Sequence, residues 1–127
     1  MKYFYKKQLV LSFDEALQKT KEILGVQDFG ILMELDISGT LYKKINAVMG
    51  KYVILGVCSP KHAYEAIKSE MDIGLLLPCN VVVYQNMDKV YVSAIMPSVA
   101  MSIVESPELA SIAKEIEGRL KSVIDLI

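Results

Sequence analysis

The residues best suited to chemistry in this sequence fall into two short clusters. The clusters hold both cysteines, the single histidine and the small polar or proline residues beside them: Cys58, Ser59 and His62, then Pro78, Cys79 and Asn80. Thiols and imidazoles serve proteins as nucleophiles, bases, redox centres and ligands of soft metals. We therefore take these residues as the candidate site and ask which chemistry their surroundings permit.

Cys58 directly precedes a predicted helix, because Ser59 is a good N-cap residue and Pro60 suits the first helical position. The positive end of the helix dipole favours a thiolate, which predicts a reactive Cys58. The alternative is a buried Cys58 that packs as a small hydrophobic residue. His62, in the first turn, can act as a base beside the thiol, although a surface histidine without such a role is the commoner case.

Cys79 and Asn80 follow Pro78, and a proline inside a strand predicts an edge or a bulge. Cys79 can face Cys58 as a redox or sulfur-handling pair, or provide a second soft ligand to a metal. Two thiols and one histidine fall short of a four-ligand zinc site unless a second copy of the chain completes it. We interpret Asn80 as satisfying the backbone at the bend.

The elements that position these residues follow from hydrophobic periodicity and from capping signals. Predicted strands cover residues 2–11, 29–37, 52–55, 75–83 and 90–95, and the predicted helices cover residues 12–25, 38–50, 59–67, 97–104 and 106–124. Ser12 and Glu15 match a capping box, and Gly25 is the expected stop of that first helix. The helix after Ser59 has an apolar side formed by Ala63, Tyr64, Ala66 and Ile67.

The last predicted helix has the clearest pattern. Its apolar residues recur every three or four positions, as expected for a stripe packed on a sheet: Leu109, Ile112, Ala113, Ile116, Leu120 and Ile124. Its charged residues fall on the other side: Lys114, Glu115, Glu117 and Arg119. Strands and helices in this order predict an α+β fold, with helices packed on one face of a mainly antiparallel sheet.

Composition limits the partners and the compartment. The 127 residues predict a single domain, 1–127. A net charge of −1 and a pI of about 5.8 argue against a nucleic-acid partner. No apolar run is long enough for a transmembrane helix, and the N-terminus lacks the pattern of a signal peptide, so we expect a cytoplasmic protein with reduced cysteines. The high hydrophobic content, 53%, predicts a homodimer that covers the free sheet face.

Two segments carry a resemblance to a known family. ILGVCSP at residues 54–60 and IGLLLPCNVVVY at residues 73–84 resemble the signature of the domain of unknown function family 302, and the likeness covers nearly the whole chain. The resemblance implies an α/β domain grouped with the TATA-binding-protein-like folds, found as a homodimer, with no settled activity. The family usually has asparagine where this chain has Ser59, which puts in doubt any role that needs an amide there.

Three functions follow from these observations. The first is a homodimeric module that binds a small ligand, a metal or a sulfur species near Cys58, Pro78, Cys79 and Asn80. The second is a thiol-dependent enzyme or redox protein with Cys58 as the reactive centre, and the third is a purely structural interaction domain. Whether Cys58 lies in a solvent-reachable pocket, with a base or a donor within hydrogen-bond distance, discriminates between the first two. Burial of both cysteines in apolar packing favours the third. The sequence names no cofactor.

Overall fold

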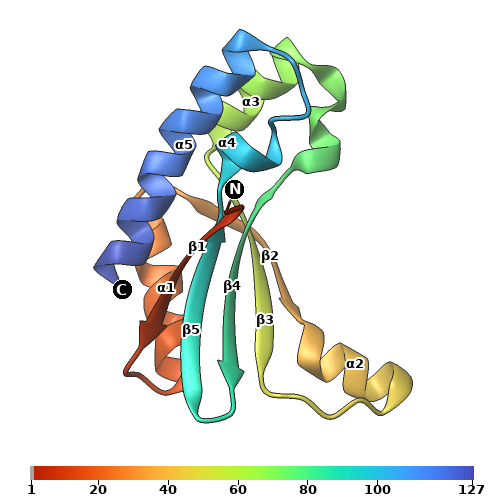
Figure 1. The fold of residues 1–127 in the computed structure, drawn as a ribbon, viewed down its shortest axis with the longest axis vertical. Helices are drawn as coiled ribbons and strands as arrows, with labels where there is room; N and C mark the ends of the chain where they lie inside the picture. The colour runs from red at the N-terminus through yellow and green to blue at the C-terminus, as the bar shows by residue number, and fades with distance from the viewer. Residues whose placement is uncertain (1) are drawn as a thin grey trace.

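A computed structural model describes residues 2–127, which form an α+β fold, as the sequence predicts (Figure 1). Within that range the elements are, in chain order, β1 (Phe4–Leu9), α1 (Phe13–Val26), β2 (Gly30–Asp36), α2 (Ile37–Ile45), β3 (Tyr52–Cys58), α3 (Pro60–Ser69), the 3₁₀ helix η1 (Met71–Leu76), β4 (Cys79–Asn86), β5 (Lys89–Ile95), α4 (Pro97–Ala100) and α5 (Pro107–Leu126). None of the helices in residues 2–127 is long and apolar enough to cross a membrane.

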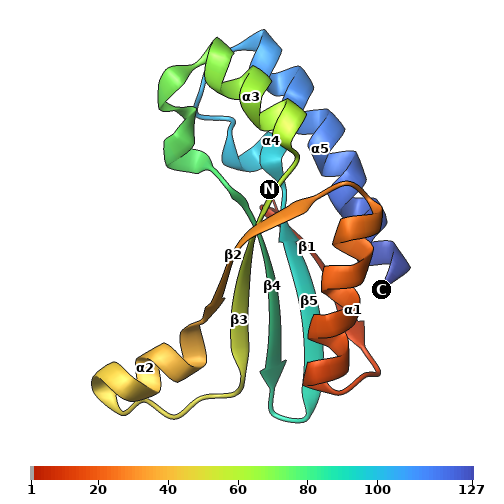
Figure 2. The ribbon, with the colours of Figure 1, turned by 180° about the vertical axis from the view of Figure 1, so that it is seen from behind.

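The strands of residues 2–127 form one sheet in the order β1-β5-β4-β3-β2, and every neighbouring pair is antiparallel. The predicted hairpin between β4 and β5 is confirmed, and Met87 in its turn has a positive φ of 59°. Helices α1 and α5 lie together on one face of this sheet (Figure 2). The antiparallel sheet covered by helices on one side is therefore as predicted.

The core fills the space between the sheet and these two helices. Alternate residues of a strand point to the same face, so every second residue of each central strand, mostly valine or leucine, is buried. The buried side chains come mainly from β3, β4 and β5 (Val53, Leu55, Val57, Val81, Val83 and Val92) and from α1 and α5 (Ala16, Leu24, Leu120 and Ile124). The stripe predicted for the last helix is confirmed, and Ser106 caps that helix through the backbone N–H of Leu109.

A second, smaller core lies beyond one end of the sheet, where α3, η1 and α4 pack against the first half of α5 (Figure 1). Here the predicted strand 75–83 is wrong at its start, because residues up to Leu76 belong to η1 and the ladder begins at Cys79. Pro78 has no N–H to donate to the neighbouring strand, so pairing begins only after it. The peptide bond between Leu77 and Pro78 is cis. The piece predicted at 97–104 is also shorter, ending as α4 at Ala100.

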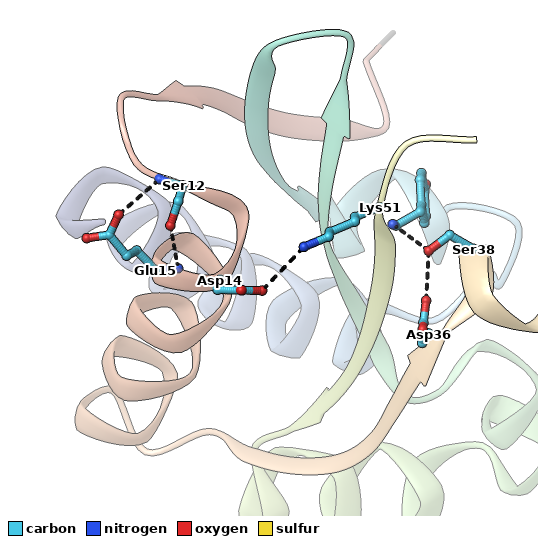
Figure 3. A network of polar contacts seen from close by, with 7 residues as sticks. Ser12, Asp14, Glu15, Asp36, Ser38 and Lys51 are labelled. Atoms are coloured by element: carbon cyan, nitrogen blue, oxygen red, sulfur yellow. Dashed lines mark hydrogen bonds and ion pairs between the residues drawn. The ribbon is translucent and has the colours of Figure 1, made fainter. Parts of the chain in front are cut away.

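The capping box at the start of α1 is confirmed: Glu15 N donates to Ser12 Oγ, and Ser12 N donates to Glu15 Oε1, both at 3.2 Å (Figure 3). The predicted stop at Gly25 is slightly early. The helix continues through Val26, and the left-handed residue that follows it is Asp28, with φ of 63°. A short polar side chain tolerates this conformation better than most, so the chain turns there without a glycine.

The second helix differs most from its prediction. It begins at Ile37, because Asp36 is the capping residue and its Oδ1 accepts from Gly39 N. The same oxygen accepts from Ser38 Oγ (Figure 3). It ends at Ile45, before the left-handed Asn46, and not at Gly50. Each residue of α2 is at least partly exposed, and the helix projects away from the sheet. Strand β2 is an edge strand, so its apolar residues are more exposed than their alternation suggests.

Candidate functional site

A cavity of about 320 Å³ lies at the junction of the sheet and the smaller core. Its walls are mostly apolar and come from β3, the start of β2, the segment before β4, and helices α3, α4 and α5. They include Phe29, just before β2, and Ala63, Ala66, Leu77, Ile112 and Ile116. All but one of the candidate residues line it: Cys58, Ser59, His62, Pro78 and Cys79. The sequence therefore points to a place where the structure has a cavity.

Asn80 is the exception, and the strand register explains why. On β4, Cys79 pairs with Val57 and Asn80 pairs with Gly56. Successive side chains of a strand point to opposite faces, so Asn80 lies on the uncovered face of the sheet, where it is exposed. There it borders a shallow groove that also contains Tyr84. Asn80 is thus on the opposite face from the cavity.

Ser59 occupies the predicted N-cap position, but its side chain does not cap α3. Its Oγ lies 2.8 Å from His62 Nδ1 and accepts a hydrogen bond of 3.1 Å from Arg119 Nη1. The Ser59 carbonyl accepts the first regular hydrogen bond of the helix, from Ala63 N. The expectation of a side-chain cap is therefore wrong, because the hydroxyl is bonded to His62 of α3 and Arg119 of α5 instead.

His62 is not the surface histidine that was expected. Its side chain is only 11% exposed, and its Nε2 lies 3.1 Å from Glu115 Oε1 on α5. The two ring nitrogens thus have different partners, Ser59 on one side and Glu115 on the other. Tyr64, which was expected on the apolar side of α3, is exposed instead, and Ala66 is the buried residue of that helix.

Sequence reasoning assigned Glu115 and Arg119 to the free side of the last helix, where the Glu115 side chain is indeed 64% exposed, but it did not connect them with the candidate site. They are four residues apart, one helical turn, on the flank of the stripe that contains Ile116. The Arg119 guanidinium lies 4.9 Å from the centre of the Phe29 ring, and its Nη2 donates to the Gln27 carbonyl. The available sequence signal was a glutamate and an arginine one turn apart beside a buried stripe. Such pairs also occur on most exposed helix faces, so the signal does not single out these two residues.

Burial affects the acidity of both thiols. Burial raises the pKa of Cys58 above its ordinary value, although a helix begins just after it. Burial, and to a lesser extent the neighbouring Cys58, raises the pKa of Cys79 to about 11. Both cysteines are free thiols. The expected preference of Cys58 for the thiolate is therefore wrong, since desolvation outweighs the helix dipole at this apolar site.

A metal was one of the expected ligands. Residues 2–127 contain no group of three or more histidine, cysteine, aspartate or glutamate side chains arranged to hold a metal ion. Every buried side-chain nitrogen or oxygen in the same range has a hydrogen-bond partner. The polar atoms at the cavity are thus bonded to one another.

Comparison with known proteins agrees with this fold. The model of the family "Domain of unknown function DUF302" matches residues 5–127. The chain belongs to the DUF302 family. The resemblance found in residues 54–60 and 73–84 is thereby confirmed.

A solved structure extends the agreement to three dimensions. This DUF302 chain is similar to the crystal structure of an uncharacterized conserved DUF302 protein from Bacillus stearothermophilus, with 27% sequence identity, 98% of each chain covered and a TM-score of 0.92. No functionally curated protein matches the sequence. Family membership therefore supports the fold and leaves the activity of the DUF302 chain to be argued from its own residues.

Proposed function

We propose that this protein binds a small, largely apolar ligand in the cavity beside Cys58. The observation that carries this proposal is the cavity itself, which is about 320 Å³ in volume and lined by apolar side chains with few polar atoms among them. Ligand sites in proteins have this character, with volumes of about 300–1,000 Å³ and a few placed polar groups. The polar groups here are Ser59 and His62.

The ligand class follows from the walls. Ile112, Ile116 and Leu77 present hydrocarbon, and both thiols are held protonated and uncharged at neutral pH because burial raises the pKa of each. An uncharged aliphatic or aromatic group gains by leaving water for such walls, at roughly 25 cal/mol per Å² of apolar surface buried. A metal ion or an anionic sulfur species gains less free energy between such walls. The thiol-dependent alternative needs a thiolate, which burial disfavours at both cysteines, so we place it second.

An uncharged apolar dye, N-phenyl-1-naphthylamine, tests this proposal. We expect saturable binding with enhanced fluorescence, competed by small aliphatic compounds. The variant Ala63→Leu places a larger side chain at the cavity wall and should weaken binding about tenfold, a change of about 1.4 kcal/mol. Ala110→Leu is the matched control, because Ala110 is exposed on α5. Equal dye binding by the two variants would contradict the proposal.

We also propose that the protein is a homodimer, with a cytoplasmic location that suits its free cysteines. Support for the dimer comes from apolar side chains gathered on β2, on α2 and just after it, which are exposed in the isolated chain: Leu32, Met33, Tyr42, Ile45, Val48 and Met49. Helix α2 projects from the sheet and buries no side chain, so packing within its own chain stabilises it little. A second copy packed on β2 and α2 would supply the missing contacts.

A further inference from the structure

A continuous chain of polar contacts joins α5 to the start of α3 at the cavity. Arg119 Nη1 donates to Ser59 Oγ at 3.1 Å, Ser59 Oγ lies 2.8 Å from His62 Nδ1, and His62 Nε2 lies 3.1 Å from Glu115 Oε1. Ser59 and His62 both line the cavity. Consecutive polar contacts thus link a serine, a histidine and a carboxylate, and the serine lines the apolar cavity.

The direction of each bond follows from donor chemistry. An ionised Glu115 carboxylate only accepts, so His62 Nε2 carries the ring hydrogen and donates to it. In a neutral imidazole the other nitrogen then accepts, so the Ser59 hydroxyl donates to His62 Nδ1. Arg119 only donates, which fits its bond to Ser59 Oγ. The serine proton is therefore directed at a histidine whose ring is held by a carboxylate.

From this arrangement we infer that Ser59 is the nucleophile of a carboxylic ester hydrolase, with His62 as general base and Glu115 as the residue that positions His62. A serine activated by histidine and oriented by an acid is the recurring arrangement of acyl transfer, and it is recognised by geometry and not by sequence order. The inference rests on the proposed function, because the acyl group of the ester would occupy the same cavity. Its walls favour a small aliphatic acyl group.

The step balances without any co-reactant except water. Ser59 Oγ forms a bond to the carbonyl carbon while its proton passes to His62 Nδ1, and the bond from that carbon to the alcohol oxygen then breaks. The leaving alcohol takes the proton from Nδ1, which leaves an acyl ester on Ser59. Water attacks this ester, gives a proton to Nδ1 and releases the carboxylic acid, and Ser59 regains its proton.

Two features can stabilise the charge that develops in this step. The Arg119 guanidinium is a cationic donor already bonded to the serine oxygen. The first-turn backbone N–H groups of Lys61 and His62 are not used by a capping side chain, and Pro60 has no N–H, so these two are the donors available to an oxyanion. The diversion of Ser59 from capping thus leaves its hydroxyl at the cavity and the first-turn N–H groups without a capping side chain.

The experiment uses the whole purified protein, p-nitrophenyl butyrate as substrate and an alkyl fluorophosphonate as covalent probe. We expect hydrolysis, and a phosphonate adduct that peptide mass spectrometry locates on Ser59. Ser59→Ala and His62→Asn should each lower kcat/KM by about 100-fold or more, the usual range for a nucleophile or base. Glu115→Gln should lower kcat with KM unchanged, since Glu115 acts through His62. Ser111→Ala is the matched control on the exposed side of α5 and should retain full activity.

The adduct in the wild-type protein needs no variant, so a misfolded variant does not obscure the result. Absence of an adduct on Ser59 after prolonged exposure, or hydrolysis by Ser59→Ala equal to wild type, would overturn the inference. The dye experiment separates the two proposals. Dye binding without an adduct leaves a ligand-binding protein in which Ser59, His62 and Glu115 only join α3 to α5. An adduct on Ser59 without dye binding supports Ser59 as a nucleophile and contradicts both the apolar ligand site and the cavity as the acyl site.

Discussion

Gly56 of β3 lies directly against the ring of Pro78, so closely that a Cβ on Gly56 would stand 2.8 Å from Pro78 Cγ. The same Cβ would lie 3.1 Å from Met33 Cε of β2. Such a close approach requires glycine, because a Cβ at this position would clash with the Pro78 ring unless one of the two residues shifted. The contact seats Pro78 at the start of β4 and so helps to fix one wall of the cavity.

We expect Gly56→Ala to destabilise the protein by about 1–3 kcal/mol, the usual cost of inserting a methyl group into a filled space. The proline ring is rigid, so it cannot yield as a flexible side chain can. Chemical denaturation followed by circular dichroism measures the change. Gly118→Ala is the control, because a Cβ on Gly118 meets nothing within 4 Å, and alanine in a helix is favoured over glycine by about 0.5–1 kcal/mol. Similar destabilisation of both variants would contradict the role of the Pro78 contact.

The sequence predicts those elements well whose burial follows a single periodicity. The last helix is an example, since Leu109, Ile116 and Leu120 recur at helical spacing and all face the core. It fails where tertiary context decides. Leu75 and Leu76 look like the start of a strand, but Pro78 offers no N–H to β3, and the segment before it closes into a 3₁₀ helix instead.

The candidate site was predicted in part for a similar reason. Local signals find Cys58, Ser59 and His62 because they surround a helix start. Their partners Glu115 and Arg119 come from a helix distant in sequence, and no local rule says which charged residues of α5 lie beside α3. The thiol pKa was misjudged because the helix dipole is visible in a sequence, whereas the desolvation of Cys58 depends on the walls around it.

Alanine variants of Ile116 and Leu120 distinguish an effect on stability from an effect on ligand binding. Ile116 is 7% exposed and lines the cavity, whereas Leu120 is fully buried in the main core. We expect each alanine variant to lose about 2–5 kcal/mol of unfolding free energy. Only Ile116→Ala should also change the affinity for the apolar dye, because it enlarges the cavity. Denaturation and dye titration measure the two effects, and a loss below about 0.5 kcal/mol at Ile116, typical of surface sites, would reject its placement.

The proposed dimer predicts that Ile45→Glu weakens association. Ile45 is 69% exposed on α2, so the substitution should leave the isolated chain stable while placing a charge in an apolar interface. Sedimentation velocity at micromolar concentrations measures the oligomeric state. Val10→Glu is the matched control, since Val10 is an exposed apolar residue outside this surface. A monomeric wild-type protein, or equal dissociation of both variants, would contradict the proposed surface.

Both thiols should react slowly with iodoacetamide in the folded protein. Burial raises the pKa of each thiol, so near neutral pH the reactive thiolate is scarcer than in a peptide cysteine, whose pKa is about 8.5. Cys79, with its pKa raised to about 11, should react more slowly than Cys58. Mass spectrometry of wild type, Cys58→Ser and Cys79→Ser over a range of pH measures both rates. Labelling of Cys58 faster than the peptide would instead restore the thiolate hypothesis.

The raised pKa of Cys79 also predicts how stability depends on pH. In the folded chain Cys79 keeps its proton up to about pH 11, whereas in the unfolded chain it loses the proton near its ordinary pKa of about 8.5. Between these values the folded state binds more protons, so the free energy of unfolding falls as pH rises through this window. Other groups titrate there too, so the comparison is between wild type and Cys79→Ala by urea denaturation. The decline should be smaller in Cys79→Ala, and parallel curves for the two proteins would show that Cys79 is not desolvated in the folded state.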